Sequence, residues 1–265
     1  MAPEGENFRS AFAIKEIAGE SNYDLNKLIE LGYNHYLSIF DSVLPPLINA
    51  YDRQPLSGPY IGLKEVIDTL RLWDKRSSVG SVATTIAIEW VNYLITSGSK
   101  RAHTNSSNQL EQVSNYSRNA SPLSQVQMLA EVTEGLKKSF GTWKVKWGDI
   151  NRYQRPGTTH EFDDDKPSLG VGLASAYYGS LPAFEVTWGR SNKSYGIAGN
   201  SFVAAVEFGE RLKAKSVITG GQSFDPDSKH FDDQAVMFLE GKFKDVLFYK
   251  EDVLKYAERT YHPGE

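Results

Sequence analysis

The sequence predicts an α+β fold, with helices in the first half of the chain and mainly antiparallel strands in the second. Up to about residue 141, apolar residues recur at the three- and four-residue spacing of a buried helix face. Beyond that point, short β-rich runs alternate with clusters of Gly, Pro and Asp, as in strands joined by turns. We therefore divide the chain into a mainly helical segment, 1–141, and a mainly β segment with C-terminal helices, 142–265. Both are expected to share one core.

Four helices are expected in the first hundred residues. The clearest is predicted over 62–73, where apolar residues at helical spacing mark one face: Leu63, Val66, Ile67 and Leu70. A second follows a possible N-cap at Asp24, and a third is expected to begin at Pro45 and Pro46, because proline suits a first helical turn. The fourth centres on Trp90.

The stretch 97–121 is rich in Ser and Asn and has almost no apolar periodicity, so we expect a loop there. A further helix is predicted after it, from six apolar residues that share a face: Leu123, Val126, Leu129, Val132, Leu136 and Phe140. Gly141 stands where a helix C-terminal glycine is expected.

Strands are expected in the second half wherever apolar and polar residues alternate: Trp143–Trp147, Phe184–Trp188 and Phe202–Phe208. The last of these is followed by a Gly209-Glu210 turn and by Ala214–Thr219, so the two runs should form a hairpin. Three further elements are predicted in the tail: helices over 232–240 and 252–259, and a short strand over 246–249.

Composition excludes several classes of protein. The 29 basic and 33 acidic residues of this 265-residue chain give a net charge of −4, and no basic stripe is present to neutralise phosphates, so nucleic acid is not an expected partner. No run approaches the roughly 20 apolar residues that cross a bilayer, and the start lacks a secretory signal, so no membrane partner is expected. The localisation is left unknown. The absence of cysteine excludes disulfides, thiolate metal sites and cysteine nucleophiles.

No metal or cofactor is predicted. The histidines lack the spacing that places two imidazoles on one metal: His35, His103, His160, His230 and His262. The acidic run 163–165 lacks the pattern of a calcium loop and is interpreted as a solvated loop. Gly170 and Gly172 open no dinucleotide-binding helix and are interpreted as flexible turn glycines.

The polar segment 220–234 allows two interpretations. Ser223, His230 and Asp233 could form a hydrolase triad, although the strained G-x-S-x-G turn of a serine nucleophile is missing. In the structural interpretation, two glycines end a strand, Gln222 and Ser223 bind loose backbone groups, and Asp232 or Asp233 caps the next helix.

Glu207 is an anomaly of a different kind. In the predicted strand 202–208 it shares a face with Val203 and Ala205, which are small and apolar. If that face is buried, the carboxylate needs a charged or hydrogen-bonding partner; if the face is exposed, Glu207 is an ordinary surface charge. The strand pattern leaves both possibilities open.

The order of motifs along the chain resembles the penicillin acylase family of N-terminal-nucleophile (Ntn) amidohydrolases. The resemblance is carried by GNSFVAAVEFGERLKAKSVITGGQSFDPDSKHFDDQ, then GKFKDVLFY and AERTYHPG, and upstream by PPLINAYD, LRLWDKRSSVGSVATTIAIEWV and WGDINRYQRPG. These motifs match the C-terminal part of the family's β chain. The resemblance covers nearly the whole sequence.

This resemblance implies part of an αββα sandwich and an enzyme that hydrolyses amides through an acyl-serine. In the family, the α-amine of an N-terminal serine acts as base, and an asparagine side chain completes the oxyanion hole. The resemblance places that serine, its histidine, the oxyanion asparagine and the calcium ligands upstream of this chain, and we do not carry the asparagine's role to Asn7. In some members, a glutamate on the strand before the GGQS turn supports the histidine, which points to Glu207. Members are often periplasmic or secreted.

We therefore interpret the chain as the C-terminal portion of a penicillin-acylase-like amidohydrolase that acts on a small acylated amide. Its partner would be the upstream segment that bears the N-terminal serine, and the chain alone is expected to be inactive. Two alternatives remain open: a non-catalytic binding or scaffold protein that retains part of the fold, and an independent hydrolase at Ser223, His230 and Asp233. The acyl group could be aromatic, a long fatty chain or dicarboxylic.

Overall fold

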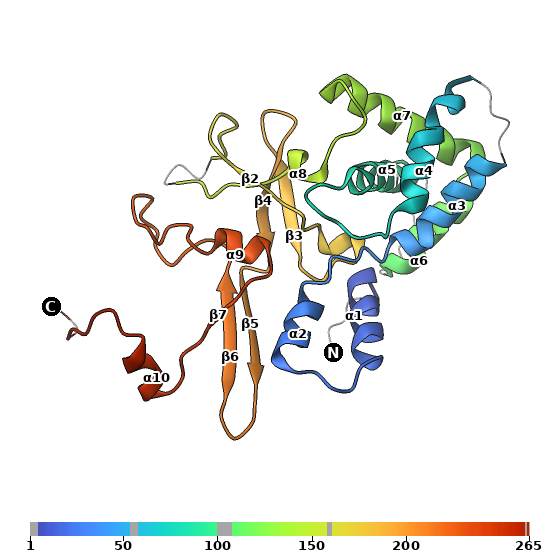
Figure 1. The fold of residues 1–265 in the computed structure, drawn as a ribbon. Helices are drawn as coiled ribbons and strands as arrows, with labels where there is room; N and C mark the ends of the chain where they lie inside the picture. The colour runs from blue at the N-terminus through green and yellow to red at the C-terminus, as the bar shows by residue number, and fades with distance from the viewer. Residues whose placement is uncertain (1–4, 54–57, 100–107, 158–160, 263, 265) are drawn as a thin grey trace. The chain divides into compact units, whose positions relative to one another are not determined.

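The computed structural model describes residues 5–53, 58–99, 108–157, 161–262 and 264 (Figure 1). Its chain divides into two compact units, each assembled from two segments: Met1–Gly19 with Asn34–Gly199 in unit 1, and Glu20–Tyr33 with Asn200–Glu265 in unit 2. Helices dominate the first half and mainly antiparallel strands follow, so the predicted α+β class is confirmed. Within the described ranges, no helix is both long and apolar enough to span a bilayer.

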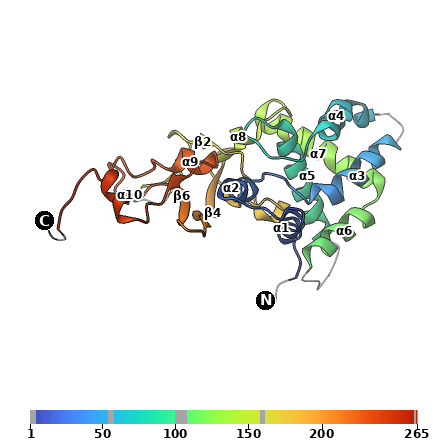
Figure 2. The same cartoon turned by 60° about the horizontal axis from the view of Figure 1, so that its bottom comes forward.

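Unit 1 is built on a group of packed helices. Its helices are α1 (Phe8–Ala18), α3 (Phe40–Asp52), α4 (Lys64–Leu72), α5 (Val82–Ser99), α6 (Gln109–Asn119), α7 (Pro122–Phe140) and α8 (Trp147–Ile150), with 3₁₀ turns η1 (Gly58–Leu63) and η2 (Ala176–Tyr178). Helix α5 packs against α4, α6 and α7, and α3 packs against α6 and α7 (Figure 2). Phe40, Ile67 and Trp90 are fully buried where these helices meet.

Two helices match the sequence prediction closely. Helix α4 buries Val66, Ile67 and Leu70 on one face. Helix α7 ends at Gly141, whose φ of 75° lies in the left-handed region that glycine adopts without a Cβ penalty. The Gly141 N–H donates to the Lys137 carbonyl, which satisfies one of the free acceptors at the helix end.

The predicted start of α3 is wrong. Pro45 and Pro46 lie inside the helix, which begins a turn earlier at Phe40. The first turn of α3 is tightened by 3₁₀-type hydrogen bonds, such as the one from the Ser42 N–H to the Ile39 carbonyl at 3.0 Å. Phe40 is completely buried. Burial of this earlier turn therefore outweighs the two backbone hydrogen bonds that the prolines cannot donate.

The loop predicted over 97–121 is also wrong where the structure describes it, because α5 continues to Ser99 and α6 follows. Residues 100–107 lie outside the described residues. Helix α6 is capped by Asn108, whose side-chain oxygen accepts from the Glu111 N–H at 3.1 Å. It buries Val113 and Ser117. A polar helix with such a narrow apolar face leaves little periodicity in the sequence.

Unit 1 also contains a four-stranded sheet in the order β2-β1-β4-β3. The strands are β1 (Asn151–Tyr153), β2 (Leu169–Gly170), β3 (Phe184–Trp188) and β4 (Ser194–Gly199); only β1 and β4 run parallel. The strand predicted over Phe184–Trp188 is confirmed. The one predicted over Trp143–Trp147 is wrong: among the described residues this segment pairs with no strand, and it leads into α8. Its alternation reflects burial of Val145 and Trp147 alone.

Unit 2 contains the second sheet, in the order β5-β6-β7. Its elements are α2 (Leu25–Gly32), β5 (Phe202–Glu207), β6 (Lys213–Ile218), α9 (Ala235–Leu239), β7 (Lys244–Asp245) and α10 (Lys250–Lys255). The predicted hairpin is confirmed, with β5 and β6 antiparallel from Phe202↔Ile218 to Glu207↔Lys213. The predicted N-cap of α2 is also confirmed, since the Asp24 carboxylate accepts from the Lys27 N–H at 2.8 Å.

The tail differs from its prediction in detail. Helix α9 starts only at Ala235, because the Asp232 carbonyl accepts the Ala235 N–H in a turn before the helix. Helix α10 starts and ends earlier than predicted. The strand predicted over 246–249 lies at Lys244–Asp245 instead. Within the segment predicted as a strand, the Val246 N–H donates to the Ala214 carbonyl of β6.

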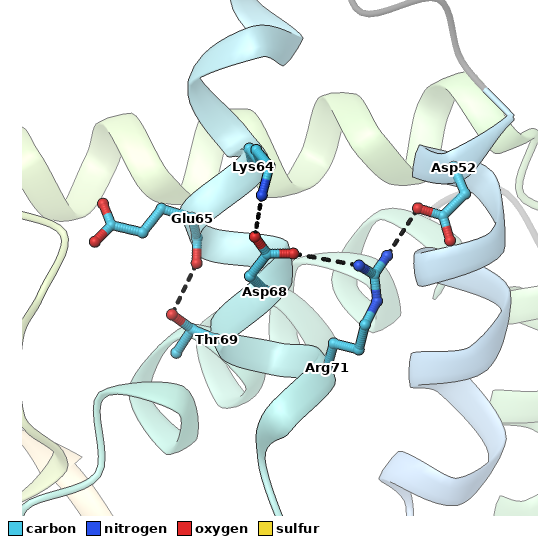
Figure 3. A network of polar contacts seen from close by, with 6 residues as sticks. All are labelled: Asp52, Lys64, Glu65, Asp68, Thr69 and Arg71. Carbon is cyan, nitrogen blue, oxygen red and sulfur yellow. Dashed lines mark hydrogen bonds and ion pairs between the residues drawn. The ribbon is translucent and has the colours of Figure 1, made fainter.

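A surface network joins α3 to α4 (Figure 3). Asp68 accepts from Lys64 at 2.5 Å and from Arg71 at 3.2 Å, and Arg71 also reaches Asp52 at 2.7 Å. These side chains are between 37% and 74% exposed, so water competes for every charge in the network.

Replacing Arg71 by alanine should therefore lower the free energy of unfolding by less than about 1 kcal/mol, since exposed ion pairs contribute little. Urea denaturation of the variant and of wild type would measure the difference. Lys64→Ala is the matched control, because it removes one ion pair of Asp68 and leaves the link from Arg71 to Asp52. A loss above about 2 kcal/mol for Arg71→Ala would contradict the prediction.

Candidate functional site

Glu207 ends β5, and its carboxylate is held from two sides. One oxygen accepts from the Lys213 ammonium at 2.7 Å, directly across the hairpin. The other accepts from the Leu25 N–H at 3.3 Å, at the first residue of α2. The face of β5 that holds Glu207 includes buried Ala205, whereas Phe202 on the opposite face is exposed.

The structure lies between the two possibilities left open for Glu207. Its side chain is about one-third exposed, and its carboxylate is paired with Lys213. The Lys213 ammonium, and after it the Leu25 N–H, hold the pKa of the Glu207 carboxyl below its usual range. The same ion pair raises the pKa of Lys213. The carboxylate is therefore a fixed anion at neutral pH, and no histidine is hydrogen-bonded to it within the part of the chain that the structure describes.

The polar segment 220–234 brings together only part of the proposed triad. His230 Nδ1 lies 2.7 Å from the Asp233 carboxylate. The Ser223 hydroxyl instead accepts from the Asp225 N–H at 3.1 Å, and among the described residues it makes no hydrogen bond to His230. The Ser223 N–H donates to the His230 carbonyl. Ser223 thus binds backbone, as the structural interpretation predicts.

The cap expected from Asp232 or Asp233 is wrong, because α9 has no side-chain cap. Asp233 binds His230 and is therefore occupied elsewhere. Buried Gln234 joins the start of α9 to the end of β6. Its N–H donates to the Gly220 carbonyl at 2.9 Å, and its side-chain oxygen accepts from the Ile218 N–H at 3.4 Å. Sequence reasoning missed Gln234, since its polarity did not distinguish it from its neighbours.

The remaining polar candidates have structural contacts. Across the described residues, no three His, Asp or Glu side chains cluster in a way that could hold a metal ion. The His35 ring binds the Ser77 carbonyl, and burial lowers its pKa; His103 and His160 lie outside the described residues. In the acidic run, Asp164 accepts from the Tyr195 hydroxyl at 2.7 Å. Asn7 caps α1 by accepting from the Ser10 N–H.

Gly172 serves close packing, so its interpretation as a flexible turn glycine is wrong. A Cβ on this residue would lie 3.1 Å from the Val79 nitrogen and 3.3 Å from the Ser78 Cα. Gly170 ends β2 and approaches the same loop. The backbone of the 78–79 loop therefore requires small residues opposite it.

The structure adds a site that sequence reasoning missed, a cavity of about 250 Å³ within unit 1. Its polar lining includes Glu89, Asn92, Asn151 and Glu185, and Trp147 and Trp188 are among its aromatic walls. Burial raises the pKa of the Glu89 carboxyl. One signal was available in the sequence, since Glu89 is the only charged residue of α5, within the apolar stretch TTIAIEWV.

Comparison with known proteins gives a consistent result. A family model described as penicillin amidase matches residues 3–255. A thermostable penicillin G acylase from Alcaligenes faecalis has a similar fold, with a TM-score of 0.52 and 11% sequence identity. The match covers 96% of this chain and 52% of that one, so the chain spans about half the length of the acylase.

Proposed function

The chain belongs to the penicillin amidase family, and on that premise we propose that it is the C-terminal portion of an amidohydrolase. The complete enzyme would hydrolyse the amide bond of an N-acylated substrate through a serine acyl-enzyme. The observation that carries this proposal is the extent of the family match, residues 3–255, combined with coverage of only about half of the similar acylase. The nucleophilic serine and the oxyanion asparagine would belong to the other half.

The chemistry explains why this chain would need that other half. An Ntn nucleophile uses its own α-amine as general base, so it must be the first residue of a chain. The nitrogen of an internal serine such as Ser223 is an amide and is not basic. Ser223 is also held by the Asp225 N–H and makes no hydrogen bond to His230 among the described residues. The 265 residues would therefore supply structure and substrate-pocket walls.

The test is to produce the 265-residue chain alone and together with the upstream acylase segment that bears the serine. Both preparations are assayed against acylated chromogenic amides and lactones. We expect no turnover by the chain alone and turnover by the pair. Turnover by the chain alone that Ser223→Ala abolishes would replace this proposal with the local triad. Inactivity of a correctly assembled pair would favour a non-catalytic binding protein.

Glu207 is the residue of this chain that we propose to act in that enzyme, by supporting the histidine beside the nucleophile. Its carboxylate is already fixed by Lys213 and the start of α2, so it could orient a donor without reorganising. Glu207→Gln preserves the shape and removes the charge. In the reconstituted enzyme, this variant should lower kcat by about 10- to 100-fold, the size of effect seen when metal-binding histidines lose their supporting partners.

Lys213→Gln is the control, because it breaks the same ion pair and leaves the carboxylate in place. It should keep kcat near the wild-type value, and thermal unfolding should show that both variants fold. Equal losses from the two variants would show that Glu207 matters only through the ion pair. Unchanged turnover by Glu207→Gln would return it to a structural role.

A further inference from the structure

The cavity within unit 1 is lined by both hydrogen-bond donors and acceptors. Three of its donors are engaged by the protein itself. Trp147 Nε1 donates to the Leu173 carbonyl at 3.0 Å, and the Ser194 hydroxyl donates to the Ile150 carbonyl at 3.3 Å. The Tyr178 hydroxyl donates to Asn92 Oδ1 at 2.7 Å. These three groups therefore have no hydrogen left to donate to a ligand of this cavity.

Asn151 adds a buried acceptor to the lining of this cavity. Its side chain is completely buried, and its amide nitrogen donates to the carbonyls of Val171 at 3.0 Å and Leu173 at 2.8 Å. These two carbonyls fix the orientation of the amide, because the flipped side chain would place its oxygen against both of them. Asn151 Oδ1 has no hydrogen-bond partner among the residues that the structure describes. A buried acceptor without a donor is costly, so a bound donor there would be stabilising.

Two carboxylates line the same cavity. Glu185 uses one oxygen to accept the Ala176 N–H at 2.9 Å. Glu89 has neither an ion pair nor a hydrogen bond with any residue that the structure describes, and burial raises the pKa of its carboxyl. The described lining includes no Lys or Arg. A cation would compensate the charge of this partly buried carboxylate, which the described residues leave unpaired.

Four of the other residues that line the cavity are aromatic. Trp147, Tyr178, Phe184 and Trp188 line the cavity together with the carboxylates. Aromatic faces attract organic cations, and a carboxylate adds a charge partner. A neighbouring hollow of about 380 Å³ shares Glu89, Ile150 and Trp188 with the cavity, so Glu89 lines both.

We propose that this cavity binds a small organic cation with N–H donors, of the primary alkylammonium class. The ammonium group would donate to Glu89 and to Asn151 Oδ1, and the alkyl group would lie against the aromatic walls. The volume of about 250 Å³ leaves room for a small organic molecule. The site lies wholly within unit 1 and does not depend on the proposed hydrolase activity.

Isothermal titration calorimetry of the whole 265-residue chain tests the proposal, with ethylammonium chloride as the probe. Ethanol is the neutral analogue, and potassium chloride at equal ionic strength supplies a bare cation. We expect saturable binding of ethylammonium, and binding of ethanol and of potassium at least 10-fold weaker. Equal affinity for ethanol, equal affinity for potassium, or no saturable heat with ethylammonium would each overturn the proposal.

Glu89→Gln should weaken ethylammonium binding by at least 10-fold. Glu134→Gln is the matched control, because Glu134 is 70% exposed and paired with Lys137 on the surface of α7, and it should bind like wild type. Trp188→Ala is a second variant, in case Glu89→Gln does not fold. Trp188 is 58% exposed, and its loss should weaken binding by about 5-fold. Wild-type affinity in either folded variant would contradict the assigned site.

Discussion

Replacing Trp90 by alanine is expected to lower the free energy of unfolding by about 3 to 5 kcal/mol, a large share of the total stability of a typical domain. Trp90 is completely buried where α5 meets α7, and its indole N–H donates to the Gln125 carbonyl at 3.3 Å. The variant would lose the transfer free energy of the largest side chain in this core and leave a cavity that the surrounding helices can only partly close.

Trp188→Ala is the matched control, since it removes the same side chain from a position that is 58% exposed. It should lower the free energy of unfolding by less than about 1 kcal/mol. Urea unfolding followed by far-UV circular dichroism would measure both variants, with equal m-values as the check that the comparison is valid. Equal losses at positions 90 and 188 would show that the core around α5 is not packed as described.

Gly221→Ala is expected to destabilise unit 2 by about 3 kcal/mol, the upper end of the usual range for overpacking. A Cβ at this position would lie 2.7 Å from the Phe231 carbonyl oxygen and closer still to that of His230. The segment cannot simply move away. The Ser223 N–H donates to the same His230 carbonyl at 3.0 Å, so any displacement that relieves the contact breaks this bond.

Gly209→Ala provides the comparison. Gly209 lies in the loop between β5 and β6, and the nearest atom to an added Cβ would be the Arg211 carbonyl oxygen at 4.0 Å. This substitution should be nearly neutral or slightly stabilising, because it restricts the unfolded chain. Hydrogen exchange of the β6 amides would detect the local loss in Gly221→Ala. Protection equal to wild type would contradict the expected effect.

Local sequence patterns predicted those elements whose stability is local. Val66 and Leu70 mark the buried face of α4, and Gly141 marks the end of α7. Sequence patterns failed where burial against other elements decides the local structure. Pro45 is tolerated inside α3 because the preceding turn buries Phe40, and the alternation that ends in Trp147 reflects burial without any partner strand. Neither outcome can be read from periodicity alone.

The two candidate sites differ in how much of each could be predicted from the sequence. Glu207 could be singled out from the sequence because a charge interrupts an alternating strand, but its cross-strand partner Lys213 lies before the predicted strand Ala214–Thr219 and is known only from the observed register. For the cavity, the sequence offers only the single charge of Glu89 within α5. Its walls come from α5, α8, β1, η2, β3 and β4, and the orientation of the Asn151 amide is set by the carbonyls of Val171 and Leu173, which only the folded chain brings to it.

The composition of unit 2 from two distant segments has a consequence during protein synthesis. Helix α2 packs against β5, and the bond from the Leu25 N–H to Glu207 joins residues 182 positions apart. Translation at about 5 to 20 residues per second separates the appearance of these two residues by about 9 to 36 s. For an interval of that length, α2 is outside the ribosome without the strand against which it packs. The speed of elongation therefore sets how long this helix is open to proteases and chaperones.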